Sequence, residues 1–135
     1  LIGKHINLSE NDLRTLKIGG LFHDIGKTKD FYRLLGFRVV FQTVNQEADE
    51  KVTFLKLGHT VIETYENKHA AMENGALDHI ALNVTDIEEV YKLVTKAGFS
   101  ILEKGIQFLP FWERGVRFFT ITGPNREKVE FSQYL

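Results

Sequence analysis

Residues 24–37 read Asp-Ile-Gly-Lys-Thr-Lys-Asp-Phe-Tyr-Arg-Leu-Leu-Gly-Phe, and residues 86–99 read Asp-Ile-Glu-Glu-Val-Tyr-Lys-Leu-Val-Thr-Lys-Ala-Gly-Phe. Asp, Ile, Gly and Phe recur in the two stretches at a spacing of 62 positions. In each copy the Asp is suited to cap a helix of about three turns, and the Gly-Phe pair is suited to end it. The sequence therefore contains two copies of one unit, and a site can be built from matching positions of the two halves.

Alternating apolar residues and turn signals predict the same order of elements in both halves. The first half contains a strand at 17–23, a helix at 25–35, a strand at 37–44, and a hairpin formed by 52–57 and 60–65. The second half contains a strand at 79–84, a helix at 87–97, and strands at 100–104, 115–121 and 127–133. A helix is also predicted near Ser9 and another over Asn67–Asn74, which Gly75 ends. Each half is βαβββ, so the predicted fold is α+β with two paired modules in a mixed, curved sheet.

Length and composition bound the domain organisation and the class of partner. The 135 residues fit an N-terminal extension (1–15) and a single domain (16–135), made of one module at 16–66 and another at 78–135. Seventeen basic and 18 acidic residues give a net charge of −1, which argues against nucleic-acid binding.

The chain contains no cysteine, which excludes disulfides, thiolate metal sites and a cysteine nucleophile, and fits the cytoplasm. No apolar run approaches the roughly 20 residues that a membrane-spanning helix needs. The sequence opens on Leu1 rather than on methionine, so we expect a fragment or a fused segment.

Three motifs resemble the vicinal-oxygen-chelate superfamily, which includes glyoxalase I, fosfomycin-resistance proteins, extradiol dioxygenases and bleomycin-binding proteins. They are Asp78-His79-Ile80-Ala81-Leu82-Asn83-Val84-Thr85-Asp86, Thr60-Val61-Ile62-Glu63, and Gly123-Pro124-Asn125-Arg126-Glu127-Lys128-Val129-Glu130-Phe131. The resemblance covers about residues 16–135 and implies the paired βαβββ fold and a homodimer. Because this superfamily contains several chemistries and some binders that do no chemistry, the motifs point to a fold more specifically than to a function.

The resemblance also implies a set of metal ligands, one from the first strand and one from the last strand of each module. The second module supplies His79 and Glu130, and the first supplies Lys17 and Glu63. One imidazole and two carboxylates suit Ni²⁺, Zn²⁺, Co²⁺ or Fe²⁺. Lys17 does not fit, because an ammonium has no lone pair to donate and repels a cation.

Two functions follow from these ligands. The first is a metal-assisted lyase or isomerase of the lactoylglutathione lyase type, acting on a small thiol adduct or an oxygenated metabolite, in which Glu63 or Glu130 moves the proton. In the second, Lys17 fills the place of the ion and the protein binds a small molecule, to sequester or sense it, without turnover. An extradiol dioxygenase is disfavoured because it uses two histidines and one carboxylate. The loop residues Phe111 and Trp112 either close the pocket or pack against a partner subunit.

Residues 1–27 carry a second resemblance, to the His-Asp segment of HD-GYP phosphohydrolases, which ends here in His23-Asp24-Ile25-Gly26-Lys27. In those enzymes the segment is helical and His-Asp binds metal. The remaining ligands would come from several other helices, whereas the sequence after Lys27 follows the βαβββ pattern. We therefore expect that His23 and Asp24 do not form that site alone.

Overall fold

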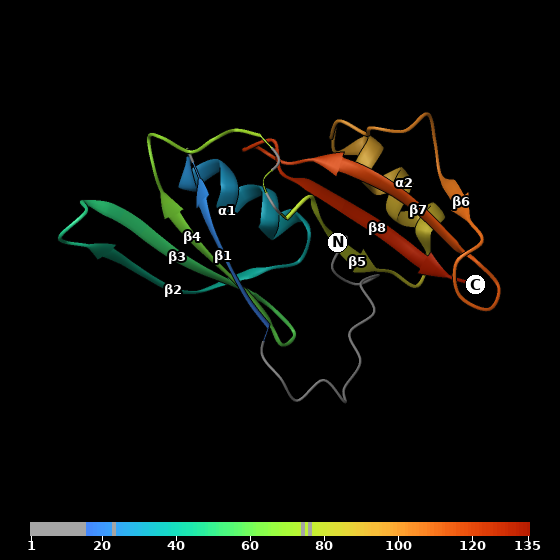
Figure 1. Ribbon diagram of the computed structural model, residues 1–135, viewed down its shortest axis with the longest axis horizontal. Helices are drawn as coiled ribbons and strands as arrows, with labels where there is room; N and C mark the ends of the chain where they lie inside the picture. The colour runs from blue at the N-terminus through green and yellow to red at the C-terminus, as the bar shows by residue number, and fades with distance from the viewer. Residues whose placement is uncertain (1–15, 23, 74, 76) are drawn as a thin grey trace.

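The computed structural model describes residues 16–22, 24–73, 75 and 77–135. These residues form two four-stranded sheets, which Figure 1 shows side by side. The N-terminal sheet has the order β1-β4-β3-β2 and the C-terminal sheet the order β5-β8-β7-β6. In each sheet the first strand of the module pairs in parallel with the last, and the other pairings are antiparallel. The predicted α+β fold of two βαβββ modules is therefore confirmed.

The elements of the two modules follow one another in the same order. The first module consists of β1 (Leu16–Phe22), α1 (Ile25–Leu34), β2 (Arg38–Asn45), β3 (Glu50–Leu57) and β4 (Thr60–Glu66). The second consists of β5 (His79–Asn83), α2 (Ile87–Lys96), β6 (Gln107–Leu109), β7 (Val116–Thr122) and β8 (Lys128–Tyr134).

The repeated Asp and Gly-Phe residues begin and end both helices as predicted. Asp24 Oδ1 accepts the Lys27 N–H at 3.0 Å, and Asp86 Oδ1 accepts the Glu89 N–H at 3.0 Å. Gly36 and Gly98 follow the two helices with φ of 102° and 78°, a conformation that glycine adopts without strain. The N–H of the next residue, Phe37 or Phe99, returns to a carbonyl of the last helical turn, so both helices end in a Schellman motif.

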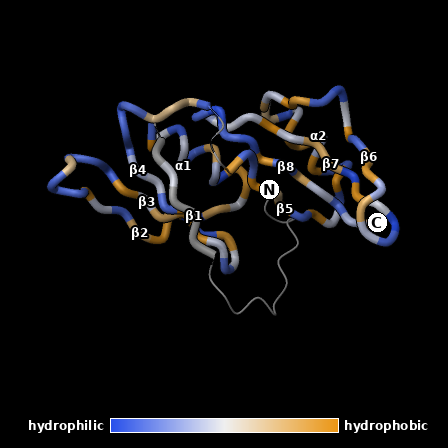
Figure 2. The backbone as a smooth tube through the Cα atoms, in the orientation of Figure 1, coloured by the Kyte–Doolittle hydropathy of each residue, from blue (hydrophilic) through white to orange (hydrophobic). Residues whose placement is uncertain are grey.

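One hydrophobic core joins the two modules. Helix α2 buries Ile87, Val90 and Val94, which share one face of the helix, against β7 and β8. Helix α1 packs in the same way on β2, β3 and β4. The core cluster takes residues from both helices and both sheets. In Figure 2 the turn between β2 and β3 is mostly hydrophilic, and hydrophobic segments lie nearer the middle of the molecule. Each helix therefore covers one face of its own sheet, and no helix of the described residues packs on the opposite face, which is called the open face below.

A hydrogen-bonded seam connects α1 to the turn between β7 and β8. The Asn125 side chain donates from Nδ2 to Thr28 Oγ1 at 2.9 Å, and the Thr28 hydroxyl donates to the Asp24 carbonyl at 2.8 Å. Tyr32 is buried, and burial, followed by the nearby negative charge of Glu127, raises the pKa of its hydroxyl. These contacts lock the first module to the second.

Two predicted elements are wrong. The strand predicted at 100–104 reduces to one bridge between Ile101 and Ile121, and β6 forms at Gln107–Leu109 instead. The Glu103 side chain accepts the Thr120 N–H at 2.7 Å. In a regular strand, a backbone carbonyl of the neighbouring segment would accept this N–H instead. Gly105, with φ of 139°, then redirects the chain before β6.

The helix predicted over Asn67–Asn74 is absent from residues 67–73, and Asn74 lies outside the described residues. Asn67 instead donates from Nδ2 to Glu50 Oε1 at 2.8 Å and accepts the His69 N–H at 2.7 Å. A side chain that bonds the backbone two residues on favours a turn over a helix. The helix predicted near Ser9 and the extension at 1–15 also lie outside the described residues.

Arg126 offers a test of backbone strain in the turn between β7 and β8. Its φ is 65°, a left-handed conformation that costs a residue with a Cβ about 1 kcal/mol or more relative to glycine. Its side chain is exposed. We expect Arg126→Gly to stabilise the protein by about 0.5 kcal/mol, because the strain relieved exceeds the entropy gained by the unfolded chain. Urea unfolding measures the change.

Arg114→Gly is the matched control for this prediction. Arg114 is exposed in a turn, and it is not among the residues with positive φ. The same substitution there gains only unfolded-state entropy and should destabilise the protein. Equal losses at both positions would contradict the strain argument.

Candidate functional site

The C-terminal sheet brings His79 and Glu130 together on its open face. The parallel pairing of β5 with β8 sets Ala81 opposite Glu130, two residues from His79. His79 Nε2 lies 3.6 Å from Glu130 Oε2. That separation is too long for a hydrogen bond, but it is close to the roughly 3.0–3.4 Å expected between two ligands of one ion with bonds near 2.1 Å. The pair therefore offers one imidazole nitrogen and one carboxylate to a divalent cation.

Asp78 fixes the orientation of His79. Asp78 Oδ2 lies 3.0 Å from His79 Nδ1, and Asp78 Oδ1 lies 3.0 Å from Lys128 Nζ. The hydrogen bond with His79, followed by that from Lys128, holds the pKa of Asp78 below its ordinary value. An anionic Asp78 keeps the proton of a neutral imidazole on Nδ1, so the lone pair of Nε2 faces Glu130. We did not predict this role, although Asp78 directly precedes the histidine that the motif pointed to.

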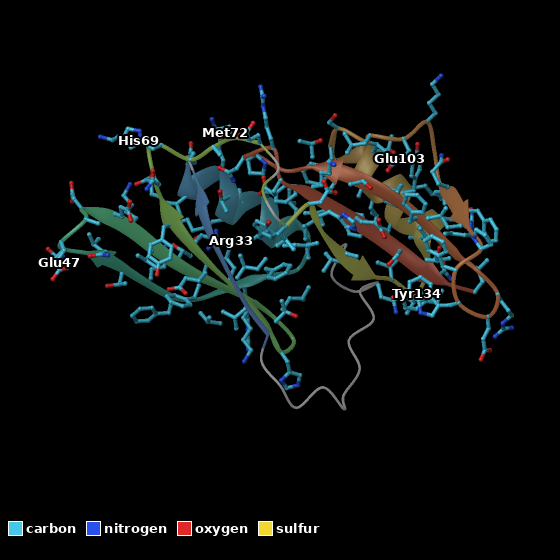
Figure 3. All side chains as sticks on the ribbon, viewed as in Figure 1. Arg33, Glu47, His69, Met72, Glu103 and Tyr134 are labelled. Carbon is cyan, nitrogen blue, oxygen red and sulfur yellow. The ribbon has the colours of Figure 1, made fainter. Side chains whose placement is uncertain are left out.

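Glu130 is partly withdrawn from water, with 22% of its side chain exposed. Burial raises its pKa, the nearby His79 opposes the rise, and the charge of Glu103 adds to it. Glu103 reaches this site from the segment after Ile101, where it accepts the Thr120 N–H, and Thr120 is the ladder partner of Glu130. Figure 3 labels Glu103 at the top of the second module, in the segment between α2 and β6. The sequence pattern gave no signal for it, because Glu103 lay in a predicted strand.

Glu63 lies on the N-terminal sheet, in β4. Its Oε1 accepts the Tyr65 hydroxyl at 2.7 Å, and this hydrogen bond is the main cause that raises the pKa of Tyr65. Strand β1 pairs Lys17 with Val61 and Gly19 with Glu63. The predicted first-module pair is thus placed on adjacent strands, as in the second module. The Lys17 side chain lies outside the described part of the structure.

Within one chain, the described residues contain no cluster of three His, Asp or Glu side chains able to hold a metal ion. The structure therefore brings two of the three predicted ligands together, His79 and Glu130, and leaves Glu63 on the other sheet.

A family model described as the Glyoxalase/Bleomycin resistance protein/Dioxygenase superfamily matches residues 22–131, which is most of the chain. The chain belongs to this superfamily. The match spans both modules and includes Glu63, His79 and Glu130. No curated protein matches the chain.

Solved structures of the superfamily share the fold. A glyoxalase family protein from Enterococcus faecalis is 22% identical, with 91% of this chain and 98% of that chain covered and a TM-score of 0.73. The fosfomycin resistance protein FosX from Listeria monocytogenes, complexed with Mn(II) and sulfate, is 13% identical, with coverages of 96% and 93% and a TM-score of 0.66. A glyoxalase I mutant from Zea mays is 15% identical, with coverages of 90% and 45% and a TM-score of 0.73.

Aromatic side chains gather at the far end of the open face in this superfamily member. The Trp112 ring lies 4.6 Å from the Tyr134 ring and 6.2 Å from that of Phe111. Tyr134, labelled in Figure 3, is four residues after Glu130 on β8, so both side chains project from the same face. Trp112 is 66% exposed. Phe111 and Trp112 therefore remain candidates for closing a pocket or contacting a partner.

The second resemblance concerns residues that carry other roles in this superfamily member, or that lie outside the described part. Asp24 caps α1, and Leu16–Phe22 form a strand. His23 and residues 1–15 are outside the described residues.

No helix in the described part is long and apolar enough to cross a membrane.

Proposed function

We propose that this protein is a metal-assisted lyase or isomerase of the lactoylglutathione lyase type, acting in the cytoplasm on a small thiol adduct or oxygenated metabolite. The observation that supports the proposal is the pair of His79 Nε2 and Glu130 Oε2 at 3.6 Å, with Asp78 holding the other imidazole nitrogen. A carboxylate behind a ligating histidine is the usual support of a metal site.

The donor set suits a divalent metal such as Ni²⁺, Zn²⁺, Co²⁺ or Fe²⁺. His79 and Glu130 would hold it, and Glu63 of a second copy in a homodimer would complete the site. When bound, such an ion polarises a substrate oxygen and stabilises negative charge that develops on it.

The side chains of the chain supply the remaining chemistry. A carboxylate, Glu63 or Glu130, takes a proton from one carbon of the substrate and returns it to the neighbouring carbon. Asp78 and Lys128 hold His79 in one orientation. Phe111 and Trp112 are placed to shield a bound substrate from water, which strengthens these electrostatic interactions.

The alternative is a binding protein that sequesters or senses a small molecule without turnover. Lys17 favours the binding protein, because a lysine stands at the position on β1 where the resemblance implies a metal ligand. In this case the ammonium replaces the cation.

Metal binding separates the two functions. Protein stripped with a chelator should bind Ni²⁺ or Zn²⁺ at one site per chain in calorimetry, and should then form lactoylglutathione from methylglyoxal and glutathione. His79→Ala should abolish both, and Asp78→Asn should weaken metal binding about 10–100-fold. His59→Ala is the matched control, because His59 is exposed in the turn between β3 and β4.

A chain that binds no metal between about pH 6 and 9, where imidazole is free to ligate, would contradict the lyase and favour the binding protein. Metal binding that survives in His79→Ala would show that the ion sits elsewhere. Lys17→His should tighten metal binding if the lysine weakens the site.

A further inference from the structure

The open face of the N-terminal sheet carries an irregularity at Val40. The pairing of β2 with β3 shifts between Val39 and Phe41, so that Val40 is an extra residue. Val39 pairs with the fully buried Leu55, whereas Val40 and Phe41 are 46% and 57% exposed. A β-bulge redirects side chains in this way and is frequent beside binding sites. In a regular strand one of two consecutive side chains would be buried, but the bulge leaves both Val40 and Phe41 exposed.

Two cations stand next to these apolar residues. Arg38 and Lys56 are direct partners across β2 and β3. Like charges directly opposite one another destabilise a sheet. In the described part of the chain, neither Arg38 nor Lys56 forms an ion pair that would relieve the repulsion. This cation pair is an electrostatic cost that a bound anion would offset.

The same residues line a shallow cavity of about 420 Å³, whose walls are Arg38, Val40, Phe41, Phe54, Lys56 and Val61. The rings of Phe41 and Phe54 meet edge to face, with centroids 5.7 Å apart. Cavities of this size hold small organic molecules. The lining combines an apolar floor with a cationic rim, which suits a ligand that has an apolar body and one negative end.

We propose that this cavity binds an aryl carboxylate, with the ring on Phe41 and Phe54 and the carboxylate between Arg38 and Lys56. The planar guanidinium of Arg38 can bind a carboxylate through two hydrogen bonds, and Lys56 adds a second positive charge. Phe54 pairs across the strands with Glu63, so a longer ligand extends toward the proposed catalytic carboxylate. This extension rests on the proposed function, because it implies that the substrate of the lyase carries an anionic group. Binding of an aryl carboxylate in the cavity does not itself require turnover.

Phenylacetate is the probe, titrated into the full chain in the presence of a chelator and followed by amide chemical shifts. We expect saturation with a Kd of about 1 mM, the range of a ligand with so few atoms, and shifts concentrated at Val40, Phe41 and Phe54. Phenylacetamide, which lacks the charge, should bind at least about tenfold more weakly, and acetate, which lacks the ring, should bind as weakly as the amide.

Substitutions locate the two parts of the site. Lys56→Gln and Arg38→Gln should each weaken phenylacetate about fivefold or more, and Phe41→Ser should weaken it similarly through lost ring contact. Lys104→Gln is the matched control, since Lys104 is exposed on a loop of the other module, and it should change nothing.

Equal binding of phenylacetate and phenylacetamide would overturn the proposal, as would equal binding of acetate, or shifts confined to the C-terminal sheet. These comparisons on the unsubstituted chain hold even if a variant fails to fold. Because the titration contains no metal, loss of the proposed lyase activity leaves its result unaffected, and its failure leaves the metal experiment unaffected.

Discussion

Glu127→Gln is expected to lower the free energy of unfolding by about 2 kcal/mol at pH 5, because both oxygens of this half-buried carboxyl group accept hydrogen bonds at the seam, whereas the NH₂ of an amide cannot accept one. Glu127 Oε2 accepts the Asn125 N–H at 2.8 Å, and Oε1 accepts from Asn125 Nδ2 at 3.4 Å. In either orientation, the NH₂ group of a glutamine would face at least one of these donors. Urea unfolding gives the difference.

Glu113→Gln is the control for this substitution, because Glu113 is exposed in the loop that contains Trp112. It should change stability by less than about 0.5 kcal/mol. Gly123→Ala should reproduce the effect of Glu127→Gln by another route, since a Cβ on Gly123 would lie 2.4 Å from Glu127 Cδ and displace the carboxylate. If both seam variants unfold like the wild type, the seam contributes little to joining the modules.

The same glutamate predicts a pH dependence. Burial raises the pKa of Glu127, and its hydrogen bonds only partly oppose the rise. The folded state then binds the proton more tightly than the unfolded state, so stability falls as pH rises from the ordinary glutamate value to the raised one. Glu127→Gln lacks this loss, and the difference between the wild type and Glu127→Gln should shrink from pH 5 to pH 8. A difference that grows with pH would show that the charged form is the one the seam favours.

The fold could be predicted from local signals because both modules repeat them. Asp24 and Asp86 cap helices, and Gly36 and Gly98 end them, through contacts within a few residues of the chain. Residues that depend on distant partners could not be predicted in the same way. Tyr32 and Glu127 come close only when the two modules pack. The strand predicted at 100–104 does not form, and the Glu103 side chain accepts the Thr120 N–H instead.

The candidate site likewise combines residues that the sequence predicted with residues that it did not. His79 and Glu130 were named from motif positions, and the parallel pairing of β5 with β8 brings them within 3.6 Å. Asp78 supports the site because it lies beside Nδ1 of His79, and the orientation of this imidazole cannot be predicted from the pattern of residue types. The position of Glu63 relative to His79 depends on how sheets of different modules or copies face each other, which hydrophobic periodicity does not encode.

Two inactive variants are expected to regain activity when they are mixed. Glu63→Gln and His79→Ala should each lower kcat about 100-fold or more, through loss of a ligand or proton carrier. If Glu63 of one copy completes the His79 and Glu130 pair of another, a mixed dimer contains one intact site and one site with both defects. Random exchange in a twofold dimer makes about half of the dimers mixed, so activity should recover to about a quarter of the wild-type value.

His79→Ala mixed with Glu130→Gln is the matched control for this recovery. Both residues belong to the pair on the C-terminal sheet of one chain, so every site in the mixed dimer lacks a ligand and activity should stay low. Lactoylglutathione formation measures recovery, and mass spectrometry of the intact dimers confirms exchange. Exchange without recovery for Glu63→Gln and His79→Ala would exclude a site shared between copies. Glu63 would then have no route to the other two ligands, because the described residues of one chain form no cluster of three.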